Sequence, residues 1–110
     1  MTGIEAIAAE RKRQIESEGW TPEHDDEHAD GSLVDAAVSY AGHAKAGTVL
    51  NAPLDMYRIA PVTVVAWPES WCTSWWKPKN PRRDLVRAGA LIAAEIDRLD
   101  RLEARQKGGA

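Results

Sequence analysis

The chain has 110 residues, a formal net charge of −3, one Cys and no Phe. This length predicts a single domain, which we place at residues 1–107 ahead of a disordered tail at 108–110. One Cys excludes a disulfide framework and a zinc site made of four cysteines. No apolar run approaches the roughly 20 residues of a membrane span, and the N-terminus lacks a secretory apolar region. We therefore expect a cytoplasmic protein with no membrane partner.

The charge is divided unevenly along the chain. Residues 1–35 carry three Lys or Arg against ten Asp or Glu, whereas residues 75–110 carry nine against five. The two ends could attract each other in the folded protein, or they could place an acidic patch beside a basic one at a ligand site. Neither arrangement gives the broad basic surface that binds duplex nucleic acid through many phosphate contacts, so no nucleic-acid duplex is expected as a partner.

The first helix is expected between Thr2 and Gly19. Thr2 has Glu5 three residues later, which is the spacing of a capping box, and Gly19 favours a C-terminal stop. Apolar residues, including Ile4, recur at helical spacing between them, and Glu10 lies outside this stripe. The segment 20–28 that follows is polar and rich in turn-forming residues, so a loop is predicted there rather than a core helix.

Two further helices are expected. Ser32 has Asp35 at capping-box spacing, and Gly47 is the expected end of that helix. Pro81 suits the first position of the last helix, which is predicted to run to Arg105. Small residues between positions 88 and 94 make one face of this helix thin, which lets another helix approach closely. We predict self-association into a homo-oligomer through this face, although the approaching helix could also come from the same chain.

Residues 48–80 are predicted to form an ordered but irregular insertion that carries most of the Trp residues. Residues 54–59 could add one helical turn, and the β-branched run 62–66 reads as a short extended segment. Three prolines after Trp67 forbid a continuous helix through the rest. The predicted fold class is therefore mainly α, with three main helices, a long C-terminal helix and at most one short extended segment. A long irregular stretch in a compact domain is usually functional.

The segment 75–83 is the first candidate ligand site. An indole face stacks on a base, while Arg and Lys neutralise phosphates. Trp75 and Trp76 are therefore predicted to stack on a ligand, and four cations to bind its phosphates, namely Lys77, Lys79, Arg82 and Arg83. About two of the five Trp are instead expected in the core, because the chain has no Phe. We assign Trp67 and Trp71 to this role.

The segment 23–28 is the second candidate, because six consecutive residues are ionisable. Asp and His suit divalent metals, but a solvated segment that pairs with the basic residues of the first helix is favoured over a metal site. A further alternative needs no metal, since carboxylates and imidazoles can hydrogen-bond a ribose or a base edge. Trp20, His24 and Asp25 would then close a pocket. Cys72 is expected to be a buried thiol rather than a nucleophile.

Two motifs resemble those of short proteins from tailed bacteriophages and prophages. They are EGWTPEHDD at 18–26, and WWKP at 75–78 followed by RRDLV at 82–86. The N-terminal part of the chain also resembles, more loosely, the RyR domain, a small helical module with an Arg-rich helix, a Gly-Trp-Thr turn and an Asp pair. The residues that match are Arg11, Arg13, Gly19, Trp20, Thr21, Asp25 and Asp26. The chain departs from that domain in the reversed order of Arg83 and Asp84 and in its additional Trp. In prokaryotes the resemblance implies sensing of nucleotide-derived ligands.

These observations favour a binding protein over an enzyme. The predicted function is sequestration, without turnover, of a nucleotide-derived host immune signal such as a cyclic nucleotide or an ADP-ribose derivative, in the cytoplasm of an infected bacterium. No catalytic residue, metal or cofactor is predicted. The predicted ligand-binding residues are Arg11, Arg13, Trp20, Thr21, His24, Asp25, His28, Trp75, Trp76, Lys77, Lys79, Arg82 and Arg83.

Two alternatives stay open. In size and helix content the chain resembles the all-α nucleotide pyrophosphohydrolases of the MazG type, which hold Mg²⁺ through paired Glu-x-x-Glu and Glu-x-x-Asp motifs. Those motifs are missing here, and the carboxylates that could replace them are Glu23, Asp25, Asp26 and Glu95. The second alternative is a protein-binding inhibitor of a host factor, because exposed Trp and Arg are typical interface anchors.

Overall fold

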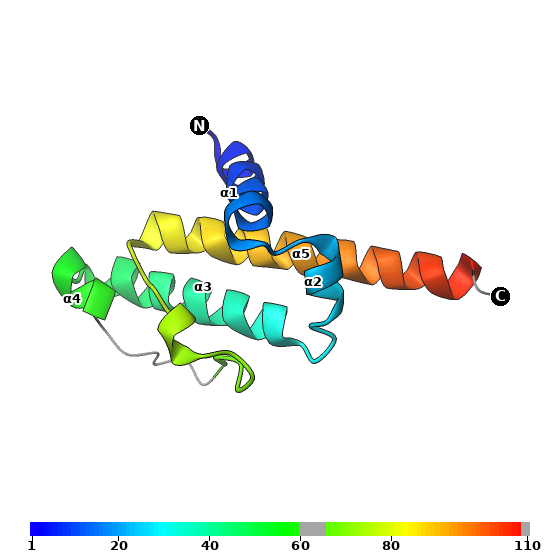
Figure 1. Ribbon diagram of the computed structural model, residues 1–110. Coiled ribbons are helices and arrows are strands. Elements are labelled where there is room, and N and C mark those ends of the chain that lie inside the picture. The colour runs from blue at the N-terminus through cyan, green and yellow to red at the C-terminus, as the bar shows by residue number, and fades with distance from the viewer. Residues whose placement is uncertain (60–65, 109–110) are drawn as a thin grey trace.

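The computed structural model describes residues 1–59 and 66–108, and these residues contain helices but no strand (Figure 1). The elements are α1 (Gly3–Glu18), α2 (Pro22–Asp26), α3 (Ser32–Leu50), α4 (Leu54–Ile59), the 3₁₀ turn η1 (Thr73–Trp75) and α5 (Pro81–Gly108). The predicted fold class is confirmed. The extended segment expected at 62–66 falls, apart from Ala66, outside the described residues. No helix in the described part of the chain is both long and apolar enough to cross a membrane.

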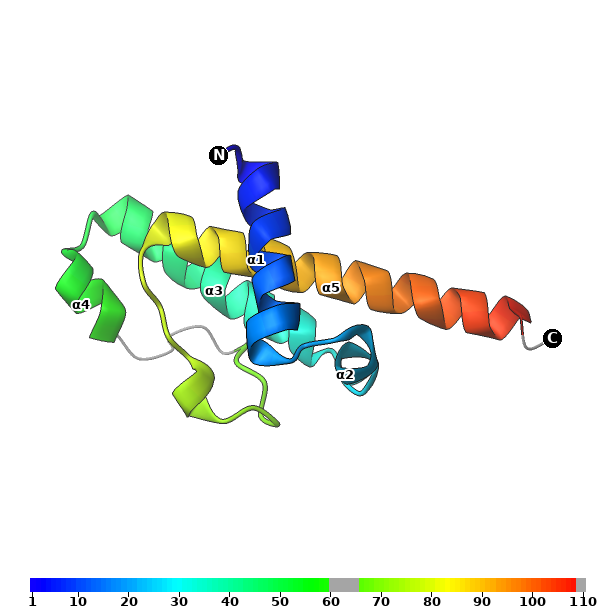
Figure 2. The same cartoon turned by 45° about the horizontal axis from the view of Figure 1, so that its top comes forward.

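The helices pack around α5, which is the longest element. Helix α3 runs antiparallel beside its first half, α1 crosses it steeply, and α2 lies against its middle (Figures 1 and 2). The C-terminal part of α5 continues beyond the other helices. Helix α4 and the segment that carries η1 lie on the α3 side, so the Trp-rich segment covers one flank of the α3–α5 pair.

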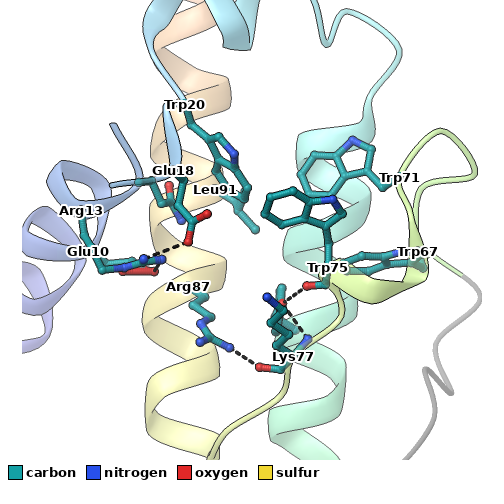
Figure 3. Close-up of a pocket in the computed structure, with 12 residues that line it drawn as sticks. Glu10, Arg13, Glu18, Trp20, Trp67, Trp71, Trp75, Lys77, Arg87 and Leu91 are labelled. Atoms are coloured by element: carbon teal, nitrogen blue, oxygen red, sulfur yellow. Dashed lines mark hydrogen bonds and ion pairs between the residues drawn. The ribbon is translucent and has the colours of Figure 1, made fainter. Parts of the chain in front are cut away.

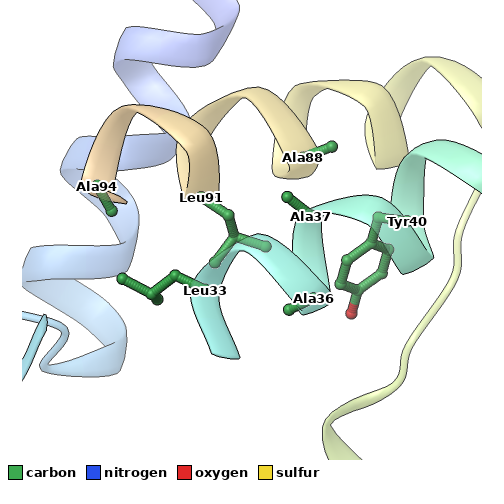
Figure 4. Close-up of a cluster of buried hydrophobic side chains, with 7 residues drawn as sticks. All are labelled: Leu33, Ala36, Ala37, Tyr40, Ala88, Leu91 and Ala94. Carbon is green, nitrogen blue, oxygen red and sulfur yellow. The ribbon is translucent and has the colours of Figure 1, made fainter. Parts of the chain in front are cut away.

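The hydrophobic core lies between α3 and α5 and consists largely of alanine (Figure 4). Leu33 and Leu91 are its largest fully buried apolar side chains, and the smaller residues around them are Ala36, Ala37, Ala88 and Ala94. Because an alanine presents only a methyl group, the two helix backbones can approach closely. The core is therefore thin, and tryptophans from outside the two helices pack along its edge.

The small-residue face of α5, which was expected to join two copies, is used within the chain. Ala88 and Ala94 are buried against α3, and Gly89 faces the side chain of Ile7 on α1. Self-association stays a prediction, and it would need a different surface. The large apolar residues that α5 leaves about half exposed are Leu85, Ile92, Ile96 and Leu99.

The first helix ends as predicted but buries a different face. Thr2 and Glu5 form the reciprocal capping box, and Gly19 adopts a left-handed φ of 74° at the C-terminal cap. However, Ile4 is 83% exposed, whereas Glu10 and Gln14 are each only 2% exposed. The apolar-stripe prediction was wrong here because buried polar contacts, described below, hold this face of α1 against the domain.

The boundaries of the other helices differ from the predictions in three places. Residues 22–26 form the short helix α2 instead of a loop, and its Asp25 is fully buried. Helix α3 is capped by Gly31, with a φ of 83° and no side-chain cap, so the predicted capping box at Ser32 does not form. Helix α5 continues past Arg105 to Gly108.

Gly47 does not end α3, because the helix runs on to Leu50. Its role is to let the ring of Tyr57 approach the backbone. A Cβ at position 47 would lie 2.5 Å from Tyr57 Cε2. The ring cannot easily retreat, since the Tyr57 hydroxyl donates a 2.5 Å hydrogen bond to the buried carboxylate of Asp84. This contact fixes α4 against the start of α5.

We expect Gly47→Ala to lower the free energy of unfolding by about 1–3 kcal/mol, as overpacking usually does. Gly3→Ala is the matched control, because a Cβ there meets no atom within 4 Å. Its effect should stay within about 0.5 kcal/mol. Chemical denaturation of both variants tests this, and equal stabilities would show that the Tyr57 ring yields freely.

Candidate functional site

A cleft opens between the C-terminal half of α1 and the Trp-rich segment, with α5 at its back (Figure 3). We call it the aromatic cleft. It has an inner hollow of about 60 Å³ and an outer hollow of about 190 Å³, which share Trp20, Trp71 and Trp75. The inner hollow is lined by these three and by Glu10, Arg13, Gln14, Glu18, Tyr40, Trp67, Lys77, Arg87 and Leu91. The outer hollow adds His24, His28, Ser70 and Cys72.

The tryptophans of the cleft contact one another edge to face. Trp71 lies at ring-centroid distances of 5.8 Å from both Trp20 and Trp67, with interplanar angles of 61° and 89°. Trp75 is 6.0 Å from Trp20 and is 43% exposed, so part of its indole ring is open to solvent. Tyr40 fixes this segment, because its hydroxyl donates to the carbonyl of Trp75 at 3.0 Å.

Three buried polar atoms of the inner hollow have no hydrogen-bond partner among the described residues. They are Oε1 of Gln14 and the indole Nε1 of Trp67 and of Trp71. A buried polar group without a partner costs about 1–3 kcal/mol, and such groups are rare in native proteins. Gln14 is only 2% exposed, so its carbonyl oxygen is out of reach of bulk water. The residues that line the hollow therefore carry one acceptor and two donors whose hydrogen bonds are not made within the described part of the chain.

Charged groups of both signs surround these atoms. Arg13 donates to Glu10 at 2.6 Å and to Glu18 at 3.0 Å, so it is already neutralised. Lys77 places its ammonium 5.7 Å from the centre of the Trp75 ring, in cation–π contact. Arg87 donates to the carbonyl of Lys77. The cations of the cleft thus stand beside carboxylates and ring faces rather than forming a strongly positive patch.

Glu10 lines the inner hollow and links α1 to α5 there. Its side chain is fully buried and accepts hydrogen bonds from Arg13 and from Arg83 of α5, each at 2.6 Å. Burial by itself opposes ionisation of Glu10, but the two guanidinium groups outweigh it and lower the pKa of this carboxyl. Arg83 was predicted to bind a phosphate, and the structure uses it to tie α5 to α1.

Other predicted ligand residues of the N-terminal part also make internal contacts. Arg11 forms an ion pair with the fully buried Asp25 and donates to the carbonyl of Trp20 at 3.3 Å. Thr21 caps α2 by accepting a hydrogen bond from the backbone of His24. Arg11, Thr21 and Asp25 do not line the cleft, whereas four other predicted residues of this part of the chain do, namely Arg13, Trp20, His24 and His28.

The predicted C-terminal binding residues divide into two groups. Trp75 and Lys77 line the cleft, whereas Lys79 and Arg82 are exposed outside it. Trp76 is not in the cleft either, because it packs on Tyr40 and His43 at ring distances of 4.8 and 5.1 Å. The predicted core residues Trp67 and Trp71 do pack against the core, and they also form a wall of the cleft.

The outer hollow brings together the imidazoles of His24 and His28, whose Nε2 atoms are 3.4 Å apart. Trp20 stacks on His24 at 6.1 Å with an interplanar angle of 2°. Cys72 lines the same hollow and is exposed, contrary to the prediction of a buried thiol. Its hydrogen bond from Ser74 lowers the pKa of the thiol.

The carboxylates required for Mg²⁺-dependent hydrolysis do not gather at one point. Asp25 pairs with Arg11, Asp26 with Arg101 and Arg105, and Glu95 with Arg98. Among the described residues, no group of three or more His, Cys, Asp or Glu side chains is placed to hold a metal ion. Nothing in this arrangement favours the pyrophosphohydrolase alternative.

Sequence reasoning missed Gln14, Glu18, Tyr40 and Arg87 as cleft residues. A weak signal existed for Gln14, because it lies four residues after Glu10 and therefore on the same face of α1. No comparable signal marked Tyr40 and Arg87. Their position depends on how the Trp-rich segment folds back over α3 and α5.

The pH dependence of stability should report on Glu10. Its pKa is lowered from the ordinary value of 4.5, so its ionised form stabilises the fold above that value, and this contribution is lost as the pH falls through the lower folded-state pKa. We expect Glu10→Gln to lower the free energy of unfolding at neutral pH by about 1–3 kcal/mol. The difference from the wild type should shrink on acidification. A constant difference in urea denaturation across that range would contradict this role.

No protein-family model matches this chain, and neither a curated protein nor a solved structure shows significant similarity to it. The functional conclusion therefore depends on the geometry and chemistry of the aromatic cleft.

Proposed function

We propose that this protein binds a small nucleotide-derived molecule in the aromatic cleft and holds it without turnover. The observation that carries the proposal is the set of unpartnered buried atoms, Gln14 Oε1 with Trp67 Nε1 and Trp71 Nε1, in a hollow walled by indole rings. A nucleobase edge presents both donors and acceptors, and its face stacks on an indole. One ligand class thus satisfies both features of the site.

The exposed part of the Trp75 ring supplies the stacking surface in this proposal. It is the most exposed of the cleft tryptophans, and Lys77 lies over its ring at 5.7 Å. A base inserted beside Trp75 would bring its sugar or phosphate close to the ammonium of Lys77. Base stacking on an aromatic side chain contributes about 1–3 kcal/mol, which makes Trp75 the main expected source of affinity.

The charge of the cleft favours a ligand with little negative charge. Three cationic side chains line the inner hollow, but Glu10 and Glu18 line it too. A triphosphate would meet these two carboxylates, whereas a cyclic phosphodiester carries only one negative charge for each phosphate. We therefore place cyclic nucleotides and compact ADP-ribose derivatives ahead of nucleoside triphosphates.

The resemblance to phage proteins suggests a biological role for this binding. A phage protein that holds a host signalling nucleotide would act by sequestration, and sequestration requires affinity but no chemistry. The cleft offers stacking and hydrogen-bonding groups in keeping with that role.

Thermal unfolding against a panel of ligands tests the proposal. The panel contains nucleosides, linear mono- and triphosphates, cyclic mono- and dinucleotides, and cyclic ADP-ribose isomers. A ligand at 100 times its Kd should add about 2.7 kcal/mol to the free energy of unfolding. Mass analysis of the compound released by heating should show it unchanged. Absence of any shift would contradict the proposal and favour a protein-binding role for the exposed Trp75.

The variant Gln14→Met separates ligand binding from folding. Methionine keeps the length of the side chain but removes the buried unpartnered oxygen, so the ligand-free variant should be as stable as the wild type or more stable. Its response to the ligand should be lost. Arg82→Ala is the control, because Arg82 lies outside the cleft, and it should keep the full response. Equal responses of both variants in calorimetric titration would place binding elsewhere.

A further inference from the structure

The outer hollow contains a pair of histidines that the nucleotide proposal does not use. His24 lies in α2, His28 follows four residues later just after that helix has ended, and both line the hollow. Their Nε2 atoms are 3.4 Å apart, and their ring centres are 4.7 Å apart, so the two nitrogens converge.

The other ring nitrogen of each histidine faces an oxygen. Nδ1 of His24 lies 3.5 Å from Oδ1 of Asp25, and Nδ1 of His28 lies 3.2 Å from the hydroxyl of Ser32. Asp25 is held as an ion pair by Arg11, so its carboxylate can only accept, and a hydrogen bond from His24 requires the tautomer with the proton on Nδ1. In that tautomer Nε2 of His24 carries the lone pair, and it lies within hydrogen-bond distance of Nε2 of His28. Imidazoles that ligate metals are oriented by oxygen partners in this way.

The spacing of the two nitrogens suits a shared metal ion. Zinc–nitrogen bonds of about 2.0–2.1 Å in a tetrahedral site place neighbouring ligand atoms about 3.3–3.4 Å apart. The surroundings also permit a cation, because no Lys or Arg side chain lines the outer hollow. Indole rings of Trp20 and Trp71 pack on the two imidazoles and hold their orientation.

We propose that His24 and His28 bind one divalent transition-metal ion of the zinc class through their Nε2 atoms, at the mouth of the aromatic cleft. The two histidines provide two of the four positions of a tetrahedral site, and the other two open into the hollow, where water can fill them. The proposal goes beyond nucleotide binding and does not depend on it, because the metal alone is the ligand.

Titration of the full chain, stripped of metal, with Co²⁺ and Zn²⁺ tests this site. Co²⁺ should give visible absorption bands of a four-coordinate ion at a stoichiometry of one per chain, and Zn²⁺ should displace it. Ni²⁺ or Cu²⁺ should quench tryptophan fluorescence, because Trp20 and Trp71 contact the two imidazoles. Absence of saturable binding would overturn the proposal, whatever the nucleotide panel shows.

Variants assign the ligands. His24→Asn and His28→Asn should each weaken binding of Zn²⁺ by at least about tenfold, and Ser32→Ala, which removes a partner of His28, should weaken it by a smaller factor. Glu27→Gln is the matched control in the same segment and should bind like the wild type. Metal-free melting temperatures show that each variant is folded. The proposal fails if His28→Asn keeps the wild-type affinity, or if Cys72→Ser abolishes binding while both histidine variants retain it.

Discussion

Three carboxylates without solvent exposure, Glu10, Asp25 and Asp84, hold the separate segments of this domain together. Each carboxylate contacts an arginine, and each also joins two helices. Glu10 links α1 to α5, and Asp25 links α2 to α1. Asp84 links the start of α5 to α4. The alanine core between α3 and α5 is thin, so these polar contacts determine where the flanking helices lie. Removing one partner of such a pair leaves a buried charge and is strongly destabilising.

This arrangement uses three of the six Lys and Arg residues that were predicted to bind a ligand. Arg11 and Arg13 pair with carboxylates of the acidic first third itself, and Arg83 joins the basic last third to Glu10. The aromatic cleft is left with balanced charge and with indole walls. The proposed binding therefore relies on stacking and hydrogen bonding, with electrostatics as a secondary contribution.

The cleft and the outer hollow share a wall but differ in chemistry. Trp20, Trp71 and Trp75 belong to both, so a molecule bound on one side contacts the rings that orient the other. On one side the buried oxygen of Gln14 has no partner among the described residues, whereas on the other side the two imidazoles lie within hydrogen-bond distance of each other. Groups kept in an unfavourable state by the surrounding fold are characteristic of binding sites, because a ligand relieves the cost.

The sequence by itself determined the mainly helical class, the capping box at Thr2, the stop at Gly19 and the start at Pro81, because these depend on residues adjacent in the chain. It also indicated that a ligand-binding site would involve the Trp-rich segment. It could not show that Arg83 faces Glu10, that Trp76 packs inward while Trp71 lines a cleft, or that Gln14 is buried. Those facts depend on contacts between residues far apart in the chain. In the sequence, an arginine that could bind a phosphate cannot be distinguished from one that pairs with a distant carboxylate. Only the tertiary structure decides between these two partners, since burial makes the internal ion pair strong and removes it from solvent.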